Sequence, residues 1–140
     1  MPPGSLIHVG EKKSDDVKIT VIDYDDKSFD EIEVKNVEEC FPFKDKPSVN
    51  WINIDGISKT DIIENIGKNY GFHSLVSEDI LNTGQRPKFE DYEDYIYIVL
   101  KMLHQPKNEI LAEQVSIIIG KNYVIPLHKA YSFYSIILIQ

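Results

Sequence analysis

The feature that most constrains the fold is the run Tyr95-Ile96-Tyr97-Ile98-Val99-Leu100, which is apolar on both faces of an extended chain. β-Branched and aromatic residues favour a strand, and a strand that is apolar on both sides belongs inside a sheet. We therefore expect an inner strand that is covered by helices. The turn residues Glu93-Asp94 precede it, and residues 88–92 form its predicted hairpin partner.

The rest of the chain predicts a mixed α/β domain. A helix is expected over residues 59–70, because apolar side chains recur there at helical spacing and Gly71 follows as a left-handed stop. Further predicted elements are strands over 6–9, 17–21, 29–34, 49–54, 113–119 and 123–127, a helical turn over 37–40 that Asn36 caps and Pro42 ends, and a short helix over 74–81.

Composition narrows the class of protein. The 140 residues have the size of one domain, and a net charge of -8 disfavours nucleic-acid binding, which needs clustered lysine and arginine. Cys40 is the single cysteine, so no internal disulfide can form and a reducing compartment is expected. No secretory signal is expected at the start of the chain. No stretch reaches the ~20 apolar residues that a membrane-spanning helix requires.

The adjacent carboxylates Glu78 and Asp79 are the candidate metal ligands. Carboxylate oxygens suit a hard dication such as Mg²⁺, which they bind directly or through its water shell. Two carboxylates cannot complete such a site, so another segment or subunit would have to supply the remaining oxygens. Spacing alone favours the simpler interpretation of two solvated acids on a short helix.

Three other candidates have structural interpretations. Arg86, the single arginine, can hold a carboxylate through two parallel hydrogen bonds, and we expect an ion pair with Glu90, Asp91 or a neighbouring chain. Trp51 lies in an apolar strand and is expected in the core. The acids of residues 90–94 are interpreted as a solvated hairpin tip.

No enzyme is predicted. The four histidines lack the spacing of a zinc site, and no P-loop or nucleophile elbow is present. His73, Ser74 and Asp79 share one short helix, where they cannot easily aim at one another as a catalytic cluster.

Several short runs, in their order along the chain, resemble the cytoplasmic N-terminal domain of the CorA family of magnesium and cobalt channels. The resemblance extends from about Pro2 to Val124. The runs are Phe41-Pro42-Phe43, Trp51 to Gly56, Leu75 to Asn82, Gln85-Arg86-Pro87-Lys88, Ile98 to Met102 and Glu113 to Ser116.

The resemblance implies a mixed, largely antiparallel β-sheet sandwiched by helices, in the cytoplasmic part of a homopentameric channel. Such domains sense Mg²⁺, with Co²⁺ also possible, because ions bound between identical subunits favour the closed pore. By this resemblance Asp79 is a ligand of the interfacial metal site and Glu78 an acid of an adjoining site. Partner carboxylates come from the stalk of the next subunit, and Arg86, Asn82 and Trp51 have structural or interface roles.

The chain also departs from the family. A stalk helix, two transmembrane helices and a Gly-Met-Asn motif are absent, and residues 125–140 leave the family pattern. We therefore expect residues 1–140 to be a single cytoplasmic domain that is soluble and cannot conduct ions by itself, whereas the full-length protein would lie in the cell membrane. The alternative is a free-standing soluble adaptor or regulatory module with an acidic protein-binding face.

Overall fold

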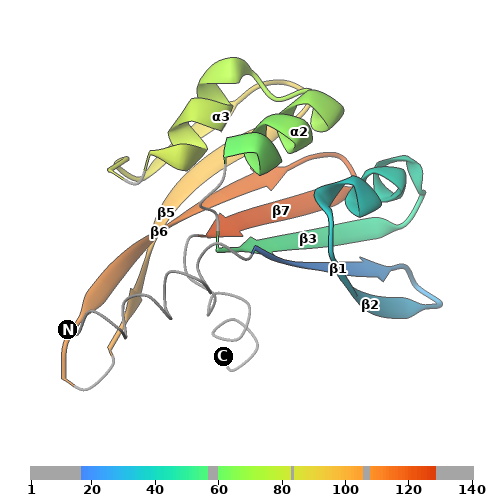
Figure 1. The fold of residues 1–140 in the computed structure, drawn as a ribbon, viewed down its shortest axis with the longest axis horizontal. Coiled ribbons are helices and arrows are strands. Elements are labelled where there is room, and N and C mark those ends of the chain that lie inside the picture. The colour runs from blue at the N-terminus through green and yellow to red at the C-terminus, as the bar shows by residue number, and fades with distance from the viewer. Residues whose placement is uncertain (1–16, 57–59, 83, 106–107, 129–140) are drawn as a thin grey trace.

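The computed structural model describes residues 17–56, 60–82, 84–105 and 108–128 (Figure 1). These residues form a seven-stranded sheet in the spatial order β2-β1-β3-β7-β6-β5-β4. Neighbouring strands are antiparallel except β3 and β7, which confirms the predicted mixed, largely antiparallel sheet. The strands are β1 (Lys18–Tyr24), β2 (Phe29–Val34), β3 (Val49–Asp55), β4 (Lys88–Asp91), β5 (Ile96–His104), β6 (Leu111–Ile119) and β7 (Tyr123–His128).

Two helices, α2 (Thr60–Tyr70) and α3 (Ser74–Leu81), lie side by side over one face of the sheet (Figure 1). Gly71, with a φ of 75°, ends α2 in the left-handed conformation that the sequence predicts. Among the described residues, α2 and α3 cover this one face of the sheet. The helices predicted over the opposite face stay a prediction. The strand predicted over residues 6–9 lies outside the described residues.

The core forms where alternate strand residues meet the inner sides of the helices. Ile52 and Ile54 of β3 are buried in the same cluster as Ile66 of α2 and Val76 and Ile80 of α3. Full burial of such a side chain contributes about 1.5–3 kcal/mol to folding. Hydrophobic contact therefore fixes the position of α3 on the sheet.

A 3₁₀ helix, η1 (Val37–Asp45), connects β2 to β3. It continues through Pro42, so the prediction that Pro42 ends a short helical turn is wrong. Proline fixes φ near −65°, which fits the 3₁₀ conformation, and its missing N–H costs less here than in a long α-helix. The start of η1 is held by Glu39, whose Oε2 accepts hydrogen bonds from the backbone N–H groups of Lys35 and Asn36, both at 2.9 Å.

Trp51 is half-buried, not a core residue as predicted. It alternates with Ile52 along β3 and therefore lies on the face of the sheet opposite to the described helices. The same face of β5 is also less buried than expected. Ile96 and Ile98 are half-buried, and Leu100 is 46% exposed. Strand β5 is an inner strand as predicted, but its second face is not fully covered.

A buried polar cluster lies at the centre of this second face. The side chains of Asn53, Asp55 and His128 are almost completely buried. The amide of Asn53 donates a hydrogen bond to Asp55 over 2.9 Å, and His128 Nε2 lies 2.8 Å from Glu113 Oε2. Burial raises the pKa of the Asp55 carboxyl to about 7, although the Asn53 hydrogen bond and the charge of Lys18 act in the opposite direction.

Candidate divalent-ion site

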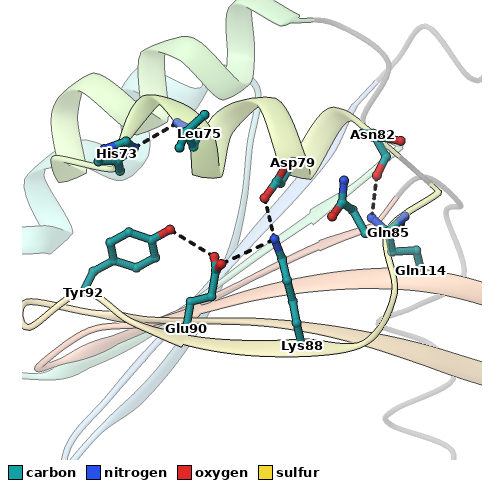
Figure 2. A network of polar contacts seen from close by, with 9 residues as sticks. All are labelled: His73, Leu75, Asp79, Asn82, Gln85, Lys88, Glu90, Tyr92 and Gln114. Atoms are coloured by element: carbon teal, nitrogen blue, oxygen red, sulfur yellow. Dashed lines mark hydrogen bonds and ion pairs between the residues drawn. The ribbon is translucent and has the colours of Figure 1, made fainter.

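Helix α3 determines where Asp79 points. His73 caps the helix, since its Nδ1 accepts a hydrogen bond of 3.1 Å from the backbone N–H of Leu75. This contact gives His73 a structural role. Val76 and Ile80 anchor the helix in the core. Asp79 precedes Ile80, and its carboxylate reaches from the flank of α3 toward β4 (Figure 2).

Lys88 of β4 meets the Asp79 carboxylate directly. Its Nζ lies 2.6 Å from Asp79 Oδ2 and 3.6 Å from Glu90 Oε2, so one ammonium group contacts two carboxylates (Figure 2). Tyr92 donates a hydrogen bond of 3.0 Å to the other oxygen of Glu90. Asp79, Lys88 and Glu90 are hereafter the edge cluster, because β4 is the edge strand of the sheet.

Electrostatics keep Lys88 charged. The hydrogen bond to Asp79 raises the pKa of the Lys88 ammonium, and the negative charges of Asp79 and Glu90 act in the same direction. The ammonium also lies 5.5 Å from the centre of the Tyr97 ring, which favours a cation. Water still reaches the pair, since the side chains of Lys88 and Asp79 are 28% and 26% exposed. The cluster is therefore accessible to water and to dissolved ions.

Glu78 does not join the edge cluster. Successive residues of an α-helix point about 100° apart, and Glu78 is exposed at a groove of about 340 Å³ that α2 and α3 line. Glu64 and Lys68 of α2 line the same groove. The two acids predicted together from sequence therefore face different surroundings.

The loop after α3 is held by a side chain from another strand. Asn82 ends the helix, and its side-chain oxygen accepts a hydrogen bond of 3.0 Å from the Gly84 N–H. Gln114 of β6 donates to the Asn82 carbonyl and accepts from the Gln85 N–H, each over 2.9 Å (Figure 2). These contacts fix the path from α3 to β4 and so place Lys88 beneath Asp79.

Arg86 and Trp51 lie outside this network. Arg86 is exposed, and none of the ion pairs found among the described residues involves it; Glu90 pairs with Lys88. Trp51 lies on the other face of the sheet. Sequence reasoning missed Lys88 and Gln114 as functional neighbours of Asp79 and placed Glu90 at a hairpin tip. The family resemblance could have indicated Lys88 and Gln114, because both residues belong to the short runs on which the resemblance rests.

The edge cluster has the donor chemistry of a partial site for a hard cation. Carboxylate oxygens are the ligands that Mg²⁺ and similar ions prefer. Across the described ranges no group of three or more histidine, cysteine, aspartate and glutamate side chains converges on a common ion position. A divalent ion at Asp79 would therefore need oxygen ligands from outside this group. In the same ranges, no helix is long and apolar enough to cross a membrane.

Comparison with solved structures shows where this fold recurs. The complete structure of the CorA magnesium transporter from Methanocaldococcus jannaschii matches with a TM-score of 0.57 and 17% identity, over 86% of this chain and 36% of that chain. The ZntB cytoplasmic domain from Vibrio parahaemolyticus matches with a TM-score of 0.61 and 13% identity, over 87% of this chain and 47% of that one. At these identities the likeness concerns the fold.

Sequence comparison shows the family. Residues 46–136 match the family model described as CorA-like Mg²⁺ transporter protein. The matched range extends past Val124, where the resemblance based on short runs ends. The cobalt/magnesium transport protein CorA of Thermotoga maritima is 46% identical over 127 residues, which cover 89% of this chain and 36% of that protein. The chain thus spans about a third of the length of this curated relative. It belongs to the family of CorA-like Mg²⁺ transporter proteins.

Proposed function

We propose that this chain is a Mg²⁺-sensing regulatory domain of a CorA-like channel for Mg²⁺ or Co²⁺. The observation that carries the proposal is the Asp79 carboxylate, which α3 holds at the sheet edge with part of its surface open to water. A buried carboxylate could not exchange ions with the solvent. An unrestrained one would pay a larger entropy cost to bind an ion.

The proposed site lies between identical subunits of a homopentamer. Asp79 supplies one set of oxygens, and carboxylates from a neighbouring subunit supply the rest. A divalent ion in such a site stabilises only the arrangement that brings both sets together, so its binding favours the closed pore. When the ion leaves, the carboxylates of the two subunits repel each other and the closed arrangement loses stability.

Glu78 is proposed as an acid of an adjoining ion site. Its exposed position at the groove between α2 and α3 is compatible with a second ion that is separate from the one at Asp79. Asn82, Arg86 and Trp51 are proposed to support the assembly. Asn82 shapes the loop after α3, and Arg86 and Trp51 present exposed or half-buried surface to neighbouring parts of the channel.

This function places the domain at the cytoplasmic face of the cell membrane, as part of an integral membrane protein. Residues 1–140 do not conduct ions alone in this proposal. We expect the isolated chain to bind divalent ions weakly and to form little pentamer, because each copy holds half of the interfacial site.

The test uses a chimaera in which this domain replaces the matching segment of Thermotoga maritima CorA. Asp79→Ala should raise the Mg²⁺ concentration required for half-maximal inhibition of transport roughly tenfold, the effect of losing about 1.4 kcal/mol of differential binding. The matched control is Asp30→Ala, which removes an exposed acid from β2 at the opposite edge of the sheet. An Asp79→Ala channel with the unmodified Mg²⁺ dependence would contradict the role given to Asp79.

A further inference from the structure

We propose that Lys88 is a built-in competitor of the divalent ion, a tethered cation that lowers the affinity of Asp79 for Mg²⁺. This inference rests on the proposed function, since it concerns the same carboxylate. It identifies Lys88 as the residue that sets the range of Mg²⁺ concentration to which the site at Asp79 responds.

The contacts of Lys88 put its charge where a divalent ion would be attracted. Its ammonium lies between Asp79, at 2.6 Å, and Glu90, at 3.6 Å. Each carboxylate comes from a separate element, α3 or β4, and both contact the same nitrogen. An ammonium group is a compact point charge with strong hydration, like a small hydrated metal ion, and so it satisfies carboxylates in a similar way.

The flexible side chain of Lys88 also allows its ammonium group to leave the Asp79 carboxylate. Lysine has a flexible four-carbon stem, and the Lys88 side chain is 28% exposed. Its ammonium can leave Asp79 and remain hydrated, so a divalent ion can replace it without leaving a charge buried in the protein. The ion must nevertheless compete with a positive charge that never diffuses away. The affinity for the ion falls accordingly.

A second consequence concerns the state without the ion. While Lys88 neutralises Asp79, this side of the subunit boundary is less negative than the carboxylates alone would make it. Repulsion between subunits is therefore reduced when the ion is absent. Lys88 therefore has two effects on the switch. It weakens the binding of the ion, which moves the switch to higher ion concentrations, and it reduces the amount by which loss of the ion destabilises the closed arrangement.

The competing explanation is that Lys88 only positions the Asp79 carboxylate. The two roles differ in the sign of one effect. Removal of a competitor strengthens divalent-ion binding at Asp79, whereas removal of a positioning residue weakens it.

The experiment follows Mn²⁺ binding to the full 140-residue chain by NMR. Mn²⁺ takes the same oxygen ligands as Mg²⁺, and it broadens the amide signals near the place where it binds. In Lys88→Met, the Mn²⁺ concentration that broadens the α3 signals by half should fall roughly threefold to tenfold, as expected for one partly exposed charge. Lys88→Arg keeps the positive charge and should retain weak binding.

Two controls make the result specific. Lys27→Met removes the same charge from the turn between β1 and β2, far from the edge cluster, and should leave the broadening unchanged. Adding Asp79→Asn to Lys88→Met should abolish the gain. Unchanged or weaker binding in Lys88→Met overturns the proposal, and so does a gain that does not depend on Asp79.

Failure of this inference can be told apart from failure of the proposed function. Asp79-dependent Mn²⁺ binding that is equal in the unmodified chain and in Lys88→Met removes the competitor role and keeps Asp79 as a ligand. Conversely, a gain in Lys88→Met together with a chimaeric channel that ignores Asp79→Ala would keep the competition and remove the sensing role.

Discussion

Asp79 and Asp55 are both carboxylates near the end of a regular element, but their surroundings differ in opposite ways. Asp79 is 26% exposed at the sheet edge and contacts a lysine over 2.6 Å. Asp55 is 1% exposed at the centre of the sheet, and the hydrogen bond to its Oδ2 comes from the uncharged amide of Asn53. Its Oδ1 has no hydrogen-bond partner among the described residues.

The difference separates a carboxylate that water and a cation can reach from one that they cannot reach. At the edge, water and the Lys88 ammonium both reach the Asp79 carboxylate. At the centre, loss of water disfavours the charge of Asp55 and raises its pKa to about 7. Acidic residues in this chain are therefore not equivalent candidates for ion binding, and burial decides between them.

Asp79 differs from a free surface acid because hydrophobic anchoring of α3, and not the ion pair with Lys88, holds it in place. Ile80→Ala tests this anchoring and should have the largest effect on stability. Ile80 is 3% exposed, so its truncation should lower the free energy of unfolding by about 2–5 kcal/mol, measured by urea denaturation. Leu75→Ala is the matched control on the same helix, and its effect should be small because Leu75 is 56% exposed. Equal losses in the two variants would refute the anchoring role of Ile80.

The next prediction concerns the pH dependence that Asp55 confers. Its folded-state pKa of about 7 exceeds the value of about 4 expected for an unfolded chain, so between these values the folded protein binds more protons. The free energy of unfolding should therefore decrease as pH rises from about 4 to 7 and change little above that on account of Asp55.

Asp55→Asn removes this dependence. The variant should gain stability relative to the unmodified chain as pH rises, reaching on the order of 1–3 kcal/mol above pH ~8. Urea denaturation of both proteins at a series of pH values measures the difference, which also cancels the titration of other groups. Asp79→Asn is the control for removal of a carboxylate that is partly exposed and not buried. Parallel stability curves for Asp55→Asn and the unmodified chain would show that burial does not shift Asp55.

The smallest effect is expected at the edge cluster itself. Without divalent ions, Lys88→Met should change the free energy of unfolding by less than about 1 kcal/mol, because partly exposed ion pairs contribute little. Any loss should shrink further at high salt, which screens exposed charges. Urea denaturation at low and high ionic strength checks this. A salt-independent loss of several kcal/mol would mean that Lys88 is a structural residue.

Local patterns in the sequence were enough to predict much of the fold. The β4–β5 hairpin, helix α2 with its stop at Gly71, and the β6–β7 hairpin each depend on residues close together in the chain. Some predictions failed where tertiary context decides, among them the full cover expected for both faces of β5. Pro42 fits inside a 3₁₀ helix, and Trp51 falls on the face of β3 opposite to the described helices.

The candidate site was less predictable than the fold. Spacing alone did not favour Asp79 over any solvated acid, and it was the family resemblance that selected it. Neither source predicted the contact with Lys88, because it depends on how the loop held by Gln114 returns the chain beneath α3. The sequence interprets the acids of residues 90–94 as a solvated hairpin tip, whereas Glu90 lies inside β4 and its side chain contacts Lys88.

Locating the ion tests the role of Asp79 more directly than any transport measurement. Crystals of the assembled chimaera grown with Co²⁺ would give an anomalous-scattering signal at each bound cobalt. We expect a peak between subunits, next to the Asp79 carboxylate, that disappears in Asp79→Ala. Cobalt peaks elsewhere in the channel, with none beside Asp79 in the closed assembly, would contradict it.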